Sequence, residues 1–361
     1  MIIGIVLNPY DEENPAGLGR IILEWTRALI ARDTENEYVV FLKRPPRTPL
    51  EFSGTRWQAF VLGGGALWLE RLRFAPRADI YLFNTPVMPL SWCPPRAIVI
   101  ALDFAYRHLP AYGFRQRVFR ILLSWYHGYS LRHAGHVVSI SEATKCDVIT
   151  FHNIAAEKIS VIYPGFVSIC EVQKVKVALP EKFFLFVGVL KQRKNVLNTV
   201  RAFIRFCERN DGYHLVVVGK GDGGYADGVR RIATESAVSS RIHFLGFISD
   251  AELAYVYSRA AVFLFPSFIE GFGFPVLEAM DCGTPVVTSR TFSLPEVGGN
   301  AALIVNPHDI DEIAHAMHTL ANDVHMRERC ITRGRIHIKN FSWEKSVQKI
   351  THIAASLYGN Q

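Results

Sequence analysis

One short stretch of the chain, residues 265–280, gathers most of the side chains that suit chemistry. An apolar run ends there, two glycines follow, and Pro275 marks the start of an expected helix, a position that proline favours. Glu270 then lies just before this helix, and Glu278 lies inside it. The free N–H groups at a helix start attract anions, and carboxylates beside them suit hydroxyl groups such as those of a sugar or a ribose. A tight strand-to-helix turn with an acidic capping residue is the simpler alternative.

Two cations, Arg193 and Lys194, form a second candidate group. They follow the apolar run 183–187 and a glycine, so they are expected beyond the end of a strand. There they could bind a diphosphate, because an arginine donates two hydrogen bonds at once to two phosphate oxygens. A solvated basic loop is the alternative.

The tripeptide Asp309-Ile310-Asp311 has the spacing D-x-D. It directly precedes a stretch with a helical apolar period, and aspartate is favoured just before a helix. We therefore predict a helix cap and a first-turn acid at these positions.

A glycine-bearing loop follows the apolar run 2–7 and contains Gly17, Gly19 and Arg20. A dinucleotide-binding fingerprint would need a third glycine at the position of Ile22, so the NAD(P)-binding interpretation fails. For these glycines a simple turn and direct ligand contact both remain open.

Asp103 and Asn84 each follow an apolar run, 97–102 and 80–83 respectively. Open parallel sheets bind ligands beyond the carboxyl ends of their strands, so Asp103 is expected to project toward a ligand. A turn or helix cap is the alternative for Asp103. The amide of Asn84 could position a ligand but could not act as a base.

Short apolar runs rich in β-branched residues alternate with longer amphipathic stretches, which is the pattern of parallel strands joined by crossover helices. Strands are expected at residues 2–7, 38–42, 80–83, 97–102, 136–140, 159–163, 183–187, 214–218, 241–245, 262–265, 285–288 and 301–305. Tyr163-Pro164-Gly165 ends one of these runs, and the residues that follow lack a clear period. The chain is therefore predicted to form two α/β domains, residues 1–165 and 166–344.

The sequence E-G-F-G-F-P-V-L-E-A-M, residues 270–280, resembles the E-x7-E signature of retaining GT-B glycosyltransferases of family 4. Segments 184–195, 245–253, 293–297 and 341–344 resemble other motifs of that family in the expected order. The resemblance implies two Rossmann-like doubly wound domains with an interdomain cleft. It also implies that a last helix, about residues 345–361, crosses back to complete the first domain. The first domain would then bind the acceptor and the second a nucleotide-sugar donor.

The same resemblance implies roles for individual residues. Glu270, with the backbone of Phe272, Gly273 and Phe274, would face the donor sugar, and Glu278 would hold the ribose. Arg193 and Lys194 would bind the diphosphate, while Asp103 would contact the acceptor or donor sugar. The other positions are Gly246 and Phe247 against the base, Gly17, Gly19 and Arg20 near the donor phosphate and acceptor, and Asn84 near the donor sugar. No metal and no cofactor are expected.

The sequence departs from the family pattern at several positions. Many members have arginine where this chain has Val189, which would place more of the neutralising charge on Arg193 and Lys194. Many relatives also have histidine before the aspartate, where this chain has Leu102. Some relatives place a histidine against the donor sugar near the position of Asn84, whose amide cannot act as a base, so a general base is not expected there.

Composition narrows the class of protein further. The 361 residues carry a net charge of +7, which indicates an anionic partner. No basic leader and no run of 18 apolar residues is present, so we expect a cytoplasmic chain without a membrane span. The six cysteines form no C-x-x-C pair, and we expect reduced, mostly buried thiols.

Residues 104–141 contain no acidic side chain but five arginines, Arg107, Arg115, Arg117, Arg120 and Arg132. Within an expected helix, one apolar face would pack on the core, and a second stripe with Phe119, Leu123 and Tyr126 would suit an anionic membrane surface. Segment 67–74 has a similar character. Helix packing with a basic rim is the equally weighted alternative.

These observations predict a glycosyltransferase that moves a hexose from a nucleotide diphosphate sugar to a hydroxyl with retention. The forms of the 193–195 and 293–297 segments resemble mannosyltransferases of polysaccharide assembly, so GDP-mannose is the expected donor and a glycan or lipid-linked glycan the acceptor. A GT-B nucleotide-sugar epimerase or hydrolase is the closest alternative. A non-catalytic nucleic-acid-binding protein is the alternative from another class, although no exposed aromatic platform supports nucleic acid as a partner.

Overall fold

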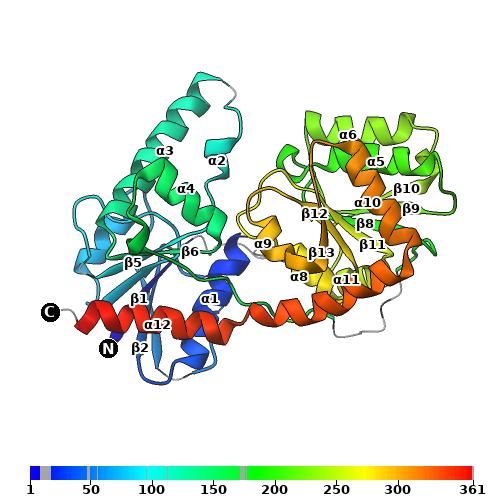
Figure 1. The fold of residues 1–361 in the computed structure, drawn as a ribbon. Helices are drawn as coiled ribbons and strands as arrows, with labels where there is room; N and C mark the ends of the chain where they lie inside the picture. The colour runs from blue at the N-terminus through cyan, green and yellow to red at the C-terminus, as the bar shows by residue number, and fades with distance from the viewer. Residues whose placement is uncertain are drawn as a thin grey trace. The chain divides into compact units, whose positions relative to one another are not determined.

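The computed structural model describes residues 1–8, 18–46, 49–54, 56–94, 96–111, 113–170, 175 and 177–359, without the side chains of Leu18 and Arg20. These residues form two compact units (Figure 1). The first comprises Met1–Gly165 and Phe341–Gln361, and the second comprises Phe166–Asn340. Each unit contains one parallel sheet between helices, as the alternation of apolar runs and amphipathic stretches predicted.

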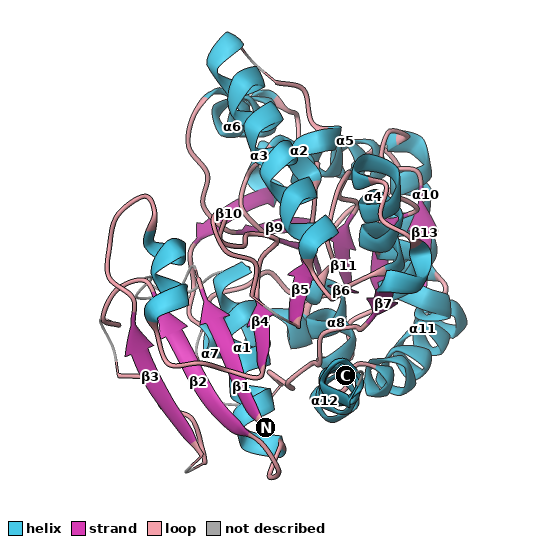
Figure 2. Ribbon diagram, turned by 90° about the vertical axis from the view of Figure 1, so that its left-hand side faces the viewer, coloured by secondary structure: helices cyan, strands magenta, loops and turns pink. Residues whose placement is uncertain are grey.

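The sheet of the first unit has seven strands in the order β3-β2-β1-β4-β5-β6-β7. The strands are β1 (Ile2–Leu7), β2 (Glu37–Leu42), β3 (Trp57–Val61), β4 (Ile80–Phe83), β5 (Ala97–Ala101), β6 (His136–Ser139) and β7 (Ile159–Val161). Figure 2 shows β3, β2, β1 and β4 side by side. The sequence did not predict β3, because this edge strand is largely exposed and forms no continuous buried apolar run. The strand order reverses between β1 and β4, which makes this the switch point of a doubly wound sheet.

The second sheet has six strands in the order β10-β9-β8-β11-β12-β13. They are β8 (Phe183–Val187), β9 (His214–Val218), β10 (Ile242–Gly246), β11 (Val262–Phe265), β12 (Val286–Ser289) and β13 (Ala302–Val305). The order reverses between β8 and β11, which pair directly with each other. The loops that follow these two strands therefore leave the same edge of the sheet as neighbours, and they carry the candidate residues of the second unit.

Helices cover both sheets. In the first unit these are α1 (Leu18–Arg32), α2 (Ala105–His108), α3 (Phe114–His133), α4 (Glu142–His152) and α12 (Trp343–Gly359), together with a 3-10 helix at Trp68–Phe74. In the second they are α5 (Val196–Cys207), α6 (Gly224–Glu235), α7 (Asp250–Arg259), α8 (Phe274–Asp281), α9 (Leu294–Gly298), α10 (Ile310–Asn322) and α11 (Val324–His337). The last helix, α12, packs on α1, and the rings of Trp343 and Trp25 lie edge to face 5.6 Å apart. Ser346 on the same helix donates to the Tyr163 carbonyl at 2.6 Å.

The predicted helix cap at the D-x-D tripeptide is confirmed. Asp309 precedes α10, and its Oδ1 accepts a hydrogen bond from the Glu312 amide at 2.9 Å. Asp311 lies in the first turn, where its Oδ1 is 2.8 Å from Nε of Arg205. Both carboxylates are thus engaged in local structure.

The prediction of mostly buried thiols is wrong. Only Cys207 and Cys330 are buried, Cys170 and Cys282 are half-buried, and Cys93 and Cys146 are exposed. The apolar character of cysteine did not reveal that four of the positions lie in loops, at helix ends or on a helix surface. Among the described residues, no helix combines the length and apolar character that crossing a bilayer requires.

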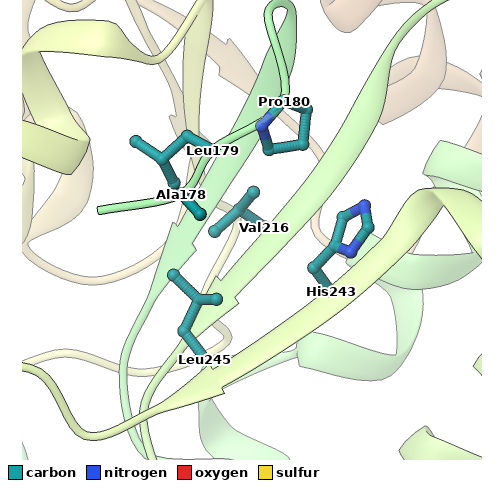
Figure 3. A pocket seen from close by; sticks show the side chains of 6 residues that line it. All are labelled: Ala178, Leu179, Pro180, Val216, His243 and Leu245. Carbon is teal, nitrogen blue, oxygen red and sulfur yellow. The ribbon is translucent and has the colours of Figure 1, made fainter. Parts of the chain in front are cut away.

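A small pocket of about 270 Å³ lies in the second unit beside β9 and β10 (Figure 3). Its lining is mostly apolar and consists of Ala178, Leu179, Pro180, Val216, His243 and Leu245. The one titratable ring is already paired, since Nε2 of His243 lies 2.9 Å from Nδ1 of His214. We interpret this pocket as incomplete packing where the segment before β8 crosses the strands.

Candidate active site

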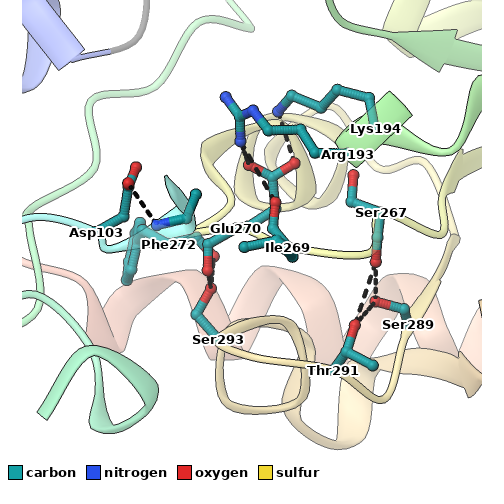
Figure 4. A network of polar contacts seen from close by, with 11 residues as sticks. Asp103, Arg193, Lys194, Ser267, Ile269, Glu270, Phe272, Ser289, Thr291 and Ser293 are labelled. Atoms are coloured by element: carbon teal, nitrogen blue, oxygen red, sulfur yellow. Dashed lines mark hydrogen bonds and ion pairs between the residues drawn. The ribbon is translucent and has the colours of Figure 1, made fainter. Parts of the chain in front are cut away.

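Glu270 lies at the centre of a polar cluster in the second unit (Figure 4). Its side chain is only 7% exposed, and its two carboxylate oxygens face different cations. Oε2 lies 3.1 Å from Nη1 of Arg193, and Oε1 lies 2.6 Å from Nζ of Lys194. The sequence assigned these three residues to a ligand separately, and their direct ion pairs were not predicted.

The cluster carries one net positive charge, because two cations face one carboxylate. Arg193 is 32% exposed whereas Lys194 is 13% exposed, so the arginine retains more contact with solvent. Nζ of Lys194 also lies 4.8 Å from the ring centroid of Phe265. A buried carboxylate needs such partners, since desolvation of an unpaired charge would be costly.

Asn195 joins the two loops that form the cluster. Its backbone is left-handed at φ 57°, and its side-chain amide donates to the carbonyls of Pro266 at 2.9 Å and Pro307 at 2.7 Å. The Phe268 amide donates in turn to the carbonyl of Arg193 at 2.8 Å. The loops after β8 and β11 are thus held together, which positions the cations against Glu270.

Buried hydroxyl groups fix the loop that carries Glu270. Oγ of Ser293 lies 2.8 Å from the carbonyl oxygen of Glu270 and 2.6 Å from that of Phe272. Farther back, Ser289 donates to the carbonyl of Ser267 at 2.6 Å, and Thr291 lies 3.2 Å from the same oxygen (Figure 4). The resemblance singled out the segment that includes Ser293, but no signal of charge or spacing indicated that this hydroxyl holds the loop.

Gly273 is required at the start of α8. Its φ is +120°, which side chains rarely adopt, and a Cβ would lie 2.8 Å from Cδ2 of Leu294. Phe272 and Phe274 flank it with their rings 5.0 Å apart, and Phe272 is buried. Pro275 lies in the first turn of α8, as the sequence predicted.

Glu278 is half-buried on α8, where its Oε2 accepts a hydrogen bond from the Tyr257 hydroxyl at 3.1 Å. Burial, followed by the negative charge of Glu278, raises the pKa of Tyr257 well above its ordinary value. The phenol therefore stays protonated and donates, which orients the carboxylate. The sequence did not indicate Tyr257, because a tyrosine on an amphipathic helix has no distinguishing signal.

The remaining candidates of the second unit lie at the end of β10. Gly246 is the last residue of that strand, and Phe247 follows it with its side chain 69% exposed. On the neighbouring loop after β8, Val189 is 46% exposed. An exposed aromatic ring at the carboxyl edge of a parallel sheet offers a stacking surface.

The candidates of the first unit differ from one another in burial. Asp103 follows β5 and is exposed, and its Oδ1 accepts from the Ala105 amide at 3.2 Å (Figure 4). Asn84 is 1% exposed, with Nδ2 3.4 Å from Thr26 Oγ1, and its Oδ1 has no hydrogen-bond partner among the described residues. Gly19 is buried in the first turn of α1, whereas Gly17 and the side chain of Arg20 lie outside the described residues.

The expectation that one apolar face of the helix within residues 104–141 packs on the core is wrong. In α3 the side chains of Phe114, Ile121, Leu122 and Trp125 are exposed, as is Phe119 of the second stripe. Only the C-terminal part is buried, at His127, Gly128, Ser130 and Leu131. A helical apolar period shows which residues share a face but not whether a partner covers that face.

Segment 67–74 behaves differently from α3. Trp68, Leu69 and Leu72 belong to the core of the first unit, and among the apolar side chains of the segment only Leu67 and Phe74 are exposed. Glu70 accepts hydrogen bonds from the amides at 90 and 91, so this segment fastens a neighbouring loop. Ordinary packing accounts for it.

Two doubly wound α/β units, with the last helix returned to the first unit, define the GT-B class of glycosyltransferases. The structure resembles sucrose-phosphate synthase from Thermosynechococcus elongatus, with a TM-score of 0.78, 20% identity and full coverage of both chains. It also resembles HepE from Anabaena in complex with UDP-glucose, with a TM-score of 0.71, 17% identity and coverage of 99% of this chain and 100% of that one.

The sequence comparisons agree with the fold. The model of glycosyl transferases group 1 matches residues 171–337, and that of Glycosyltransferase Family 4 matches residues 15–167. The O-antigen chain mannosyltransferase B of Escherichia coli is 33% identical over 277 residues, which cover 73% of this chain and 71% of that protein. The chain belongs to the glycosyltransferase family that these two models describe.

Proposed function

We propose that this glycosyltransferase moves a hexose, mannose from GDP-mannose as first choice, to a hydroxyl of a glycan or lipid-linked glycan with retention of configuration. The observation that carries the proposal is the buried cluster of Glu270, Arg193 and Lys194. The choice of mannose rests on the similarity to an O-antigen chain mannosyltransferase. A nucleotide sugar as donor is in keeping with the UDP-glucose held by HepE.

The net charge of the cluster suits a diphosphate. Arg193 and Lys194 would bind the donor diphosphate and stabilise the negative charge that grows on it as its bond to C1 breaks. The acceptor oxygen would bond to C1 on the same face, and the leaving phosphate would take the acceptor proton. This step uses no metal and no cofactor, so we propose neither.

The other residues of the second unit would orient the donor. Glu270 and the backbone from Phe272 to Phe274 would meet the sugar, Glu278 would bind the ribose hydroxyls, and Gly246 with Phe247 would lie against the base. Tyr257 would keep Glu278 in position through its hydrogen bond.

In the first unit, we propose that Asp103 contacts the acceptor or the donor sugar. Gly17, Gly19 and Arg20 would approach the donor phosphate. Asn84, which is almost fully buried, would contribute through position only.

A donor panel tests this proposal. GDP-mannose, UDP-glucose and their free nucleotide diphosphates are compared by thermal shift, and the product is analysed by NMR for its anomeric configuration. Stabilisation by GDP-mannose and an unchanged anomeric configuration are expected. Absence of stabilisation by every nucleotide contradicts the proposal, and donor turnover without an acceptor identifies an epimerase or hydrolase instead.

The exposed face of α3 supports a further partner, an anionic membrane surface on the cytoplasmic side. Phe119 is 63% exposed and Leu122 is 60% exposed. The arginines of residues 104–141 have no acidic neighbours within that segment. Exposed apolar side chains beside cations can bind an interface through apolar burial and attraction to anionic lipids.

Vesicle flotation tests this partner. Phe119→Ser/Leu122→Ser is expected to lose binding to phosphatidylglycerol vesicles. The wild type is expected not to bind vesicles of neutral phosphatidylcholine. Val324→Ser/Ile336→Ser, which removes two exposed apolar side chains from the second unit, is the matched control. A wild type that does not float with anionic vesicles contradicts the proposal.

A further inference from the structure

A groove of about 560 Å³ lies within the first unit, far along the sheet from β1, between the edge strand β7 and the last helix α12. It is lined by Lys145, Ile159, Ser160, Val161, Ile162, Lys345, Gln348, Lys349, His352 and Ile353. Every lining residue belongs to the first unit. The volume is in the range of small-molecule sites in proteins.

The groove is positively charged. Lys345, Lys349 and His352 recur at helical spacing on one face of α12, and Lys145 faces the groove from α4. The lining contains no acidic residue, and none of the three lysines forms an ion pair within the described part of the chain. Like charges one turn apart destabilise a helix, so an anion in the groove would relieve an existing repulsion.

The floor of the groove adds apolar surface and one backbone donor. Ile159, Ile162 and Ile353 supply the apolar part. The Ile162 amide donates to Ser139 on β6 at 2.9 Å, so the amide of the preceding residue, Val161, points to the free edge of the sheet. The Val161 amide has no neighbouring strand to pair with in the described sheet, because β7 is its last strand.

We propose that this groove binds a small soluble molecule that bears a phosphate or diphosphate group beside an apolar part. The lysines and the Val161 amide would hold the phosphate oxygens by charge-assisted hydrogen bonds, and the isoleucines would contact the apolar part. The concave shape favours a small molecule over a membrane. β7 has only three residues, and Ser346 already donates to the carbonyl of Tyr163, which disfavours an added peptide strand.

The site is separate from the proposed donor site, whose Arg193 and Lys194 lie in the second unit. Its binding goes beyond the proposed function and does not depend on it. Failure of either proposal therefore leaves the other intact.

The test follows individual lysines by NMR after reductive ¹³C-methylation, with inorganic pyrophosphate as the probe. Signals missing from Lys145→Ala, Lys345→Ala and Lys349→Ala assign the three groove lysines. In the wild type these three signals are expected to shift together with one affinity. In Lys345→Ala/Lys349→Ala, the affinity for pyrophosphate that is measured from the Lys145 signal is expected to be weaker by about tenfold or more.

Lys182→Ala/Lys339→Ala, which removes two exposed lysines from the second unit, is the matched control and should leave the affinity unchanged. The proposal is overturned if the groove signals do not respond, or if all lysine signals move alike. It is also overturned if phosphatidylglycerol vesicles or an acidic peptide shift the groove signals while pyrophosphate does not. Donor turnover by Lys345→Ala/Lys349→Ala at the wild-type rate is expected, because these residues take no part in transfer.

Discussion

The candidate residues Glu270 of the second unit and Asp103 of the first unit differ in burial and in polar contacts. In the second unit, Glu270, Arg193 and Lys194 satisfy one another in a nearly buried cluster, and Asn195 and Ser293 hold the two loops in place. In the first unit, Asp103 is exposed and accepts one local hydrogen bond. The ion pairs of the second unit hold its charged side chains in place before any ligand binds, whereas the Asp103 carboxylate stays accessible to solvent.

The largest expected effect comes from removing a cation of the second unit. Lys194→Ala should lower turnover about 10²–10³-fold, because under the proposed function it removes a preorganised charge beside the leaving group. Steady-state kinetics with the donor identified by thermal shift measures this. Lys191→Ala, which removes an exposed lysine three residues away, is the control. Equal turnover in both variants would mean that Lys194 only neutralises Glu270.

A second prediction concerns acid stability, which we expect the first unit to lose. His127 and His152 are buried at the base of α3, and burial lowers the pKa of each from 6.5 to about 4. The unfolded chain therefore binds more protons than the folded one between pH 6.5 and 4, so stability falls as the pH falls through this window. Between pH 7 and pH 5 the loss should be on the order of 2 kcal/mol per histidine.

Urea unfolding at pH 7 and pH 5 measures this loss, and tryptophan fluorescence assigns it to a unit. All six tryptophans, at positions 25, 57, 68, 92, 125 and 343, belong to the first unit. His152→Phe should reduce the difference between the two pH values, while His133→Phe, at an exposed position on α3, should not. An unchanged difference in His152→Phe would show that other groups cause the acid sensitivity.

A smaller effect is expected from the hydroxyl that holds the Glu270 loop. Ser293→Ala leaves the carbonyls of Glu270 and Phe272 without this donor, at a cost of about 1–3 kcal/mol in the free energy of unfolding. Far-UV circular dichroism during urea unfolding is the measurement. Ser258→Ala, which removes an exposed helix hydroxyl, should change stability by less than about 0.5 kcal/mol. If the two variants behave alike, the loop is held by other contacts.

The smallest effect tests the open site of the first unit. Asp103→Ala should leave stability within about 0.5 kcal/mol, because the side chain is exposed, yet lower turnover about tenfold. Full turnover in this variant would limit Asp103 to its hydrogen bond with the Ala105 amide. The contrast between the two units would then become sharper still.

Periodicity was sufficient for most of the fold. The strands β1, β4, β8, β9 and β11 match the expected ranges, because strands buried on both faces leave continuous apolar runs. The exposed edge strand β3 left no such run and was missed. The helical pattern of α3 was recognised, but its exposure was not, because the sequence of one helix says nothing about which neighbours cover it.

The sequence by itself determined the α/β class, the order of the motifs and the residue types available for chemistry, since these depend on local pattern and spacing. Tertiary structure decided which of those residues meet. Arg193 and Glu270 are 77 positions apart in the chain, yet they form an ion pair because β8 and β11 are neighbours in the sheet. The groove of Lys145, Lys345 and Lys349 arises in the same way, from the return of the last helix to the edge of the first sheet.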